Sequence, residues 1–305
     1  MGKKYTIEES KKIADKIRLR VFEHVLKNNG GYLSQGTSSA EIFSALYTQI
    51  MNLNESEAPM IPEPFKSVPN KEYYRNGSEY NGKRTADSDV FVFSPSHYGL
   101  VLYSTLIEVG RMAAEGLEQF NKDGSVVELI AAEHSPGCET TTGSLAQGIS
   151  QAGGIALGRR LKNETGKVWV FMSDGEFSEG QVWEAIMVMV NYKLDNIGVL
   201  VDINGQQCDG VMCDVMDQLD LEKKIEAFGA KVVTVDGHDI EQIVKASKID
   251  RQDKPLFILC STDPMYKIPI MKERYPKIHT IKFTDSIEEK QRYQKAFEEL
   301  RKEVL

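Results

Sequence analysis

The spacing of apolar residues predicts that helices and buried strands alternate along most of the chain. Apolar residues recur at helical spacing within residues 7–28, and Thr6 and Glu9 have the spacing of an N-terminal capping box. A second helix is expected from about Ser39, after the glycine-rich segment NNGGYLSQG. From Asp89 onwards, short apolar runs alternate with helical patterns, which is typical of an α/β protein.

The buried strands of this alternation are expected in the segments KVWVFMSD, NIGVLVDIN, AKVVTVDG and PLFILCST, and a short strand that ends in a turn is expected in DVFVFSPSHYG. Strands separated by single helices predict right-handed crossovers and a parallel sheet with helices on both faces. Helical patterns are expected, among others, over 101–117 and 286–304. We see no repeat and no second domain boundary, and therefore expect one domain over residues 1–305.

One segment differs from this pattern. Residues 54–88 are polar and contain four prolines and many serines, asparagines and lysines, which predicts a long loop inserted into the domain. Such an insertion could serve as an active-site lid or a partner contact, or it could be a solvated excursion.

Charge and composition exclude several classes of function. The 305 residues have a formal net charge of −8, which argues against a surface for nucleic acid or for an anionic membrane. The N-terminus lacks the apolar core of a signal peptide, and no apolar run is long enough to span a membrane. The cysteines have no metal-binding spacing, so we interpret them as reduced thiols in a cytoplasmic protein: Cys138, Cys208, Cys213 and Cys260.

Candidate chemistry lies at the ends of two neighbouring predicted strands. Asp174 follows the strand VWVFM, and Asn204 follows VLVDI about thirty residues later. Ligands of open α/β sheets bind beyond the carboxyl ends of the strands, and Gly175 and Gly205 allow a close approach of the backbone. Carboxylate, amide and carbonyl oxygens suit Mg²⁺, or the more permissive Ca²⁺, with diphosphate oxygens completing the coordination. Each turn is common when taken alone, but their joint position favours a metal-bound diphosphate.

Two other phosphate-binding patterns are not found in the sequence. No G-x4-G-K-[ST] loop is present, and no G-x-G-x-x-G fingerprint of a dinucleotide site. A bound metal can offset the charge of a diphosphate, so a lysine-bearing loop is not required.

Around these turns the sequence resembles the thiamine-diphosphate signature of transketolases. The matching segments are EGQVWEA at 179–185, KLDN at 193–196, NGQQCDG at 204–210, PGCETTTGSLAQG at 136–148 and EAFGAKVVTVDGHD at 226–239. The resemblance covers about residues 10–262 and implies a thiamine-diphosphate-binding fold. It further implies transfer of a two-carbon ketol unit, or a related acyl unit, from a ketone donor to an aldehyde acceptor.

The length of the chain then suggests a divided enzyme. Full transketolases also carry a pyrimidine-binding domain and a C-terminal domain, and this chain resembles the N-terminal subunit of a split transketolase. The resemblance therefore implies a separate pyrimidine-domain subunit, an α2β2 assembly and a cofactor at the interface. The helix around 143–158 and the segment around Glu179 are the candidate interface.

By the same resemblance, roles can be assigned residue by residue. The metal ligands are expected to be Asp174, Asn204 and the carbonyl of Gln206, and His97, His134 and Glu179 are the catalytic candidates, with Glu179 in an inter-subunit carboxylate network. His238, in DGHD, is expected to be structural, and His24 a surface or core residue. The cofactor contacts are expected to be Ser96, Gly143, Ser144, Leu145, Gly175, Glu176 and Asn204.

The sequence departs from the family at four places. Ser173 replaces the first glycine of the signature, and Tyr32 stands where the family has a substrate-contacting histidine. Pro95 replaces a lysine and Tyr98 a glycine in the segment SPSHYG. The family's Lys-Gly-Lys-Gly and Trp-His-Gly segments are missing after the last strand, where His279 is a further imidazole that could reach the site. These changes lie at the expected donor and acceptor pocket, whereas the expected metal ligands are unchanged. We therefore expect a non-standard substrate.

Two other functions remain open at the level of sequence. The chain could be the α chain of another two-chain thiamine-diphosphate enzyme, one that acts on 2-oxoacids. It could also be a catalytically silent, cofactor-binding scaffold, a hypothesis that Ser173 and Tyr32 motivate and that Asp174, Asn204 and His97 oppose.

Overall fold

The computed structural model describes residues 5–66, 76–283 and 286–305. Its centre is a five-stranded sheet in the order β2-β3-β4-β8-β7, in which every neighbouring pair is parallel. The expected parallel sheet is therefore confirmed, and it is built from all five predicted segments. The strands are β2 (Val90–Phe93), β3 (Val168–Ser173), β4 (Ile197–Ile203), β7 (Lys231–Asp236) and β8 (Leu256–Ser261).

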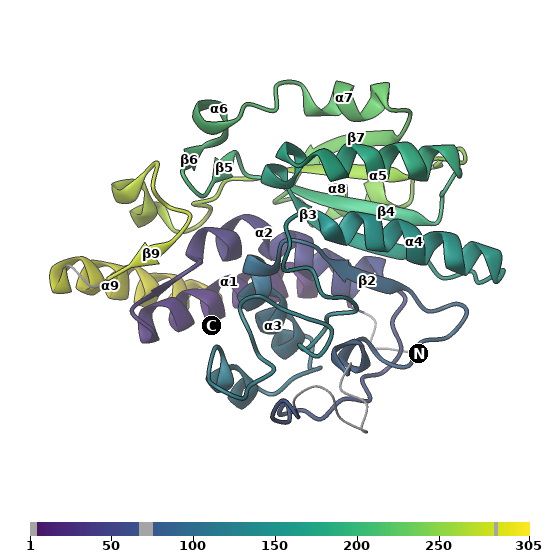
Figure 1. The fold of residues 1–305 in the computed structure, drawn as a ribbon. Coiled ribbons are helices and arrows are strands. Elements are labelled where there is room, and N and C mark those ends of the chain that lie inside the picture. The colour runs from purple at the N-terminus through teal and green to yellow at the C-terminus, as the bar shows by residue number, and fades with distance from the viewer. Residues whose placement is uncertain (1–4, 67–75, 284–285) are drawn as a thin grey trace.

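Helices cover both faces of this sheet, as Figure 1 shows. Strand side chains alternate between the faces: Phe91 and Phe93 pack into one hydrophobic core, whereas Val90 and Val92 pack into the other. The first core is closed by α1 (Ile7–Lys27), α2 (Leu33–Ala45), α3 (Gly99–Glu108), α8 (Ile240–Ser247) and α9 (Ile287–Val304). The second is closed by α4 (Gln147–Leu161), α5 (Gly180–Asn191) and α7 (Leu221–Ala227). A short helix, α6 (Met212–Val215), follows the β5–β6 hairpin described below.

The N-terminal helix begins as its sequence predicts, but α2 does not. Thr6 and Glu9 form the capping box of α1. Helix α2 begins at Leu33, six residues before the expected start. The polar residues in its first turns are buried within the helix and do not form a turn at the surface. The Thr37 and Ser39 hydroxyls donate to carbonyls one turn back at 2.7 and 2.6 Å, so they do not need water.

Helix α3 is shorter than the pattern over 101–117 predicts. It ends at Glu108, and Gly110 follows in the left-handed region with a φ of 77°. The remaining residues form a separate 3-10 helix, Ala114–Gln119.

The described parts of the segment 54–88 are attached to the scaffold. Tyr80 and Asn81, in a 3-10 helix (Gly77–Asn81), are almost fully buried. The Arg111 guanidinium donates to the carbonyls of Tyr80 and Asn54 at 2.7 and 2.9 Å. These parts therefore pack as ordered structure, and residues 67–75 of the predicted loop lie outside the described residues.

Two small ribbons lie beside the main sheet. β1 (Gly30–Gly31) pairs antiparallel with β9 (Ile281–Lys282), and a Cβ atom on Gly30 would lie 2.4 Å from the Ile281 carbonyl oxygen. A glycine at position 30 thus permits the C-terminal segment to approach the start of α2. The second ribbon is a hairpin of β5 (Gln206–Gln207) and β6 (Gly210–Val211) directly after β4.

Two further expectations concern the environment of the chain. Within the described ranges, no helix combines the length and the apolar character needed to cross a bilayer. All four cysteines are free; Cys138 and Cys260 are buried, whereas Cys208 and Cys213 are exposed.

Candidate functional site

The turns that follow β3 and β4 are in direct contact. Asp174 Oδ2 accepts a hydrogen bond from the backbone N–H of Gly205 at 2.8 Å, and Oδ1 accepts one from Gly175 at 2.8 Å. The contact arises because β3 and β4 are adjacent parallel strands whose carboxyl ends meet at one edge of the sheet. The fold therefore brings together the two turns in which the metal ligands are expected.

The Asn204 side chain has a defined orientation. Its Oδ1 accepts from the backbone N–H of Gln206 at 2.9 Å, and because an N–H can only donate, this atom is the oxygen. Its Nδ2 donates to Asp202 Oδ2 at 2.9 Å. The Gln206 side chain is also buried, and its Oε1 has no hydrogen-bond partner among the described residues. An unpaired buried acceptor beside Asn204 is compatible with a cation or its water ligands.

Electrostatics at this edge favour a bound cation. Burial, together with the nearby Asp202, raises the pKa of Asp174 to about 8. Burial likewise raises the pKa of Asp202. Two buried carboxyl groups are costly when ionised, and a divalent ion would offset that cost. In the described parts of the chain, no three His, Cys, Asp or Glu side chains form a metal-binding group.

Glu176 connects three segments around the site. Its Oε1 accepts from the Ser94 hydroxyl and from the Ala146 N–H at 3.0 Å, and its Oε2 accepts from the Ser173 N–H at 2.9 Å. Burial raises the pKa of this carboxyl group to about 7. Ala146 directly follows the exposed residues 143–145, so Glu176 fixes the predicted cofactor-binding loop against the ends of β2 and β3.

A cluster of three rings, Tyr32, His97 and His279, lies at the start of α2. The ring centroids are separated by 5.8 Å (Tyr32–His97), 5.6 Å (Tyr32–His279) and 5.3 Å (His97–His279). Tyr32 follows β1 and His279 precedes β9, so the β1–β9 ribbon brings together two rings that are distant in sequence. We refer to these residues as the ring cluster.

Both imidazoles of the ring cluster are neutral near pH 7. Burial, with a smaller effect of His279, lowers the pKa of His97 to about 3, and burial also lowers the pKa of His279. Gln35 Nε2 lies 3.3 Å from His279 Nδ1 and donates to the His279 carbonyl oxygen at 3.4 Å. Since a carbonyl only accepts, the Gln35 atom is the amide nitrogen and Nδ1 is an acceptor. His279 therefore carries its proton on Nε2 and can donate it to a ligand.

The other predicted site residues lie outside the ring cluster. His134 contacts Glu128 at 3.1 Å and packs on Phe65, and in the described structure it shares no ring contact with His97. Ser96 is buried in the 3-10 helix that carries His97. Glu179 is exposed at the start of α5, where it can reach a second chain.

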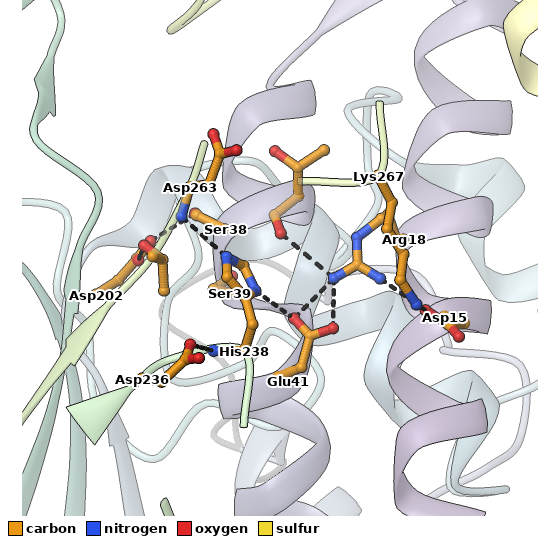
Figure 2. A network of polar contacts seen from close by, with 12 residues as sticks. Asp15, Arg18, Ser38, Ser39, Glu41, Asp202, Asp236, His238, Asp263 and Lys267 are labelled. Carbon is orange, nitrogen blue, oxygen red and sulfur yellow. Dashed lines mark hydrogen bonds and ion pairs between the residues drawn. The ribbon is translucent and has the colours of Figure 1, made fainter. Parts of the chain in front are cut away.

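His238 belongs to a structural network that Figure 2 shows. Arg18 donates to both oxygens of Glu41 at 2.6 and 2.7 Å, and Glu41 Oε2 lies 3.1 Å from His238 Nδ1. His238 Nε2 accepts from the Asp263 backbone N–H at 2.9 Å, so the ring is neutral with its proton on Nδ1. The ring also stacks on Tyr266 at 3.7 Å. This network fixes the segment after β8 to α1 and α2, which accords with the structural role expected for His238.

Asp202 and Gln35 were not predicted from the sequence, whereas His279 was named there as an imidazole that could reach the site. Asp202 is fully buried and accepts from four side chains, including Ser38 and Thr262 at 2.6 and 2.5 Å. A charged residue inside the otherwise apolar strand VLVDI is a signal that could have identified it. No local signal marks His279, since its site contacts depend on the β1–β9 pairing.

Comparisons with known proteins agree with this geometry. Residues 72–295 match the family described as "Transketolase, thiamine diphosphate binding domain". The 6-deoxy-6-sulfo-D-fructose transketolase subunit SqwG of Clostridium sp. (strain MSTE9) is 31% identical over 252 residues, which cover 82% of each chain. An apulose-4-phosphate transketolase subunit of Actinobacillus succinogenes is 28% identical over 286 residues, 92% of this chain and 94% of the relative.

Among solved structures, the transketolase from Leishmania mexicana is similar in fold. Its TM-score is 0.67 at 21% identity, and the match covers 99% of this chain and 46% of that one. The chain thus spans about half the length of this solved transketolase.

Proposed function

Because the chain belongs to the family of transketolase thiamine-diphosphate-binding domains, we propose that it is the diphosphate-binding subunit of a two-chain transketolase. The reaction is transfer of a two-carbon ketol unit from a ketose donor to an aldehyde acceptor. The observation that carries this proposal is the contact between Asp174 and the Asn204–Gly205 turn at the carboxyl edge of the sheet.

The site fits Mg²⁺ and the diphosphate of the cofactor. Asp174, Asn204 and the carbonyl of Gln206 would hold the ion, with Gly175, the segment 143–145 and Ser96 beside the cofactor. When bound, thiamine diphosphate supplies the carbanion chemistry needed to cleave a carbon–carbon bond next to a carbonyl. The chain's own residues bind the ion, orient the diphosphate and provide buried hydrogen-bonding groups at the substrate.

The ring cluster is the proposed substrate wall of this subunit. Neutral His97 and His279 can exchange hydrogen bonds with the hydroxyl and carbonyl oxygens of a ketose, and the Nε2–H of His279 is available as a donor. A tyrosine at position 32 is larger than a histidine and presents a phenol in place of an imidazole, so the pocket differs from that of ordinary transketolases.

A non-standard ketose is therefore the proposed donor. Two relatives of similar length are named for 6-deoxy-6-sulfo-D-fructose and for apulose 4-phosphate, and these names support an unusual sugar for this chain as well.

The second chain would supply the pyrimidine-binding domain. The groove between α4 and α5, lined by Gly153, Gly154, Glu184 and Val188, is open at the surface. Met187 and Val188 on α5 are about half exposed. Exposed apolar side chains beside a groove are typical of a surface that binds a partner. We assign this groove, with the exposed Glu179 at the start of α5, to the partner subunit in an α2β2 assembly.

The test is whether the two reconstituted subunits cleave a ketose donor in a buffer that resembles the cytoplasm. The chain is co-expressed with its pyrimidine-domain partner and supplied with Mg²⁺ and thiamine diphosphate. Xylulose 5-phosphate, 6-deoxy-6-sulfofructose and apulose 4-phosphate are offered as donors with glyceraldehyde 3-phosphate or ribose 5-phosphate as acceptor, and pyruvate is offered in a parallel assay. Release of the shortened aldose supports the proposal. Release of CO2 from pyruvate instead would indicate a 2-oxoacid enzyme, and cofactor binding without any turnover would indicate a silent scaffold.

A further inference from the structure

The Tyr98 hydroxyl lies between the buried Asp202 and the predicted metal ligand Asn204. Its Oη is 2.9 Å from Asp202 Oδ2 and 2.9 Å from Asn204 Nδ2, and the residue is 2% exposed. The resemblance to transketolases places a glycine at position 98. The phenol is therefore a feature of this chain, and the family's pattern does not explain it.

The direction of each hydrogen bond in this triangle follows from its neighbours. The Gln206 N–H identifies Asn204 Oδ1, so the other amide atom is nitrogen and must donate. Nδ2 donates to both Asp202 Oδ2 and Tyr98 Oη. Having accepted from Asn204, the Tyr98 hydroxyl donates its own hydrogen to Asp202 Oδ2. Rotation of the Asn204 amide would break both contacts of its nitrogen.

The orientation of the Asn204 amide determines whether its oxygen or its nitrogen faces the proposed cation. Asn204 Oδ1 is left on the side of the Gly205–Gln206 backbone, whose two N–H groups bind Asp174 Oδ2 and Oδ1 of Asn204 itself. An amide rotated by half a turn would present NH2 to a cation, which repels it. The two hydrogen bonds of Nδ2 exclude that rotamer.

We propose that Tyr98 is a positioning residue for the metal site: with Asp202, its hydroxyl holds the Asn204 amide so that the oxygen faces the cation. This rests on the proposed function, since it requires Asn204 to be a metal ligand. Groups that orient metal ligands in this way typically change metal affinity by about 10–100-fold when they are removed.

The decisive variant is Tyr98→Phe, which removes the hydroxyl and keeps the ring. Tyr103→Phe is the matched control: this residue is also fully buried, and its hydroxyl donates to the Glu128 carbonyl at 2.7 Å, in α3 and away from Asn204. Both variants remove a tyrosine hydroxyl with its hydrogen bonds, two in Tyr98→Phe and the one to the Glu128 carbonyl in Tyr103→Phe, so a general loss of stability affects both. Only Tyr98→Phe removes a contact of the metal ligand.

The measurement is Mn²⁺ binding, followed by electron paramagnetic resonance, to the reconstituted two-chain protein saturated with thiamine diphosphate. We expect Tyr98→Phe to raise the dissociation constant about tenfold or more and Tyr103→Phe to leave it within about twofold of wild type. Steady-state activity of Tyr98→Phe should recover at high Mg²⁺. An unchanged dissociation constant in Tyr98→Phe would overturn the proposal.

A second variant covers the case in which Tyr98→Phe does not fold. Asp202→Ala removes both carboxylate oxygens, so Asn204 Nδ2 loses this acceptor and the Mn²⁺ affinity should fall similarly. Unchanged affinity there would also contradict the role of the triangle. If wild type itself binds no Mn²⁺ in the presence of thiamine diphosphate, the proposed function fails together with this inference; if wild type binds and the variants bind equally well, only the inference fails.

Discussion

Asp174 Oδ2 accepts a hydrogen bond from the backbone N–H of Gly205 at 2.8 Å, across 31 residues of sequence. This contact joins the turns after β3 and β4, which carry the proposed metal ligands Asp174 and Asn204. The proposed cofactor site depends on this contact between Asp174 and Gly205, so a substitution of Asp174 is its first test.

Asp174→Ala is expected to abolish Mg²⁺-dependent binding of thiamine diphosphate to the reconstituted protein, because the ion loses its only carboxylate ligand in the proposed set. The fold should persist, since the parallel pairing of β3 with β4 does not depend on this side chain. Isothermal titration calorimetry at fixed Mg²⁺ measures the affinity of the wild type and of the variant for thiamine diphosphate.

The control for this experiment is Asp195→Ala. Asp195 is exposed and precedes β4, at the opposite end of the strand from Asn204. Equal cofactor affinity in Asp174→Ala and Asp195→Ala would contradict the metal site.

The ring cluster predicts a change in substrate use. His279→Ala should lower kcat/KM for the ketose donor by about 10–100-fold, which corresponds to about 1.4–2.7 kcal/mol, because an Nε2–H donor to the substrate is lost. Cofactor affinity should stay near that of wild type. His24→Ala is the control, since His24 is a partly buried histidine that packs on Phe120 outside the site.

Tyr32→His tests whether the tyrosine defines the donor. We expect the variant to gain activity on ordinary ketose phosphates relative to the wild-type donor, because a third imidazole would replace the larger phenol in the ring cluster. The ratio of kcat/KM for xylulose 5-phosphate and for the best donor measures this. An unchanged ratio would remove the reason to connect Tyr32 with substrate choice.

Buried neutral histidines predict a loss of stability in acid. Burial, with the neighbouring His279, lowers the pKa of His97 to about 3, and burial, with Lys27, lowers that of His24 to about 4. In the unfolded chain both titrate near pH 6.5, so between pH 6.5 and about 4 the unfolded state binds more protons. The free energy of unfolding therefore rises with pH in this window. The stability that the two neutral histidines contribute is lost progressively as the pH falls below about 6.5.

Urea unfolding at several pH values between 4.5 and 7.5 measures this slope. His97→Gln and His24→Gln should each reduce it by up to about 1.4 kcal/mol per pH unit, the contribution of one proton. Identical profiles in wild type and both variants would mean that these imidazoles accept protons in the folded state.

The proposed partner surface predicts a failure of assembly. Val188→Glu places a charge in the groove between α4 and α5, which should prevent association with the pyrimidine-domain subunit. Ile287→Glu is the control, because Ile287 on α9 is 79% exposed and lies outside that groove. Co-purification and light scattering compare the two, and a heterotetramer that forms equally well with Val188→Glu would place the interface elsewhere.

The five strands were predictable because each is a short apolar run between helical patterns, and this pattern depends only on burial within the sheet. The start of α2 was not predictable from the sequence, since Thr37 and Ser39 are typical of a turn until their hydroxyls donate to carbonyls within the helix. The end of α3 was missed for a related reason, because the helical pattern continues after Gly110 although the chain turns there.

The sequence alone determined the parallel α/β sheet, the family and the candidate metal ligands, because these follow from residue types at short separations and from segments in a recognisable order. The tertiary structure alone decided which distant residues meet. The β1–β9 ribbon places His279 against Tyr32 and His97, and the strand ends place Tyr98 and Asp202 on the amide of Asn204. No local pattern encodes such contacts, since they depend on the pairing and packing of elements that are far apart in the chain.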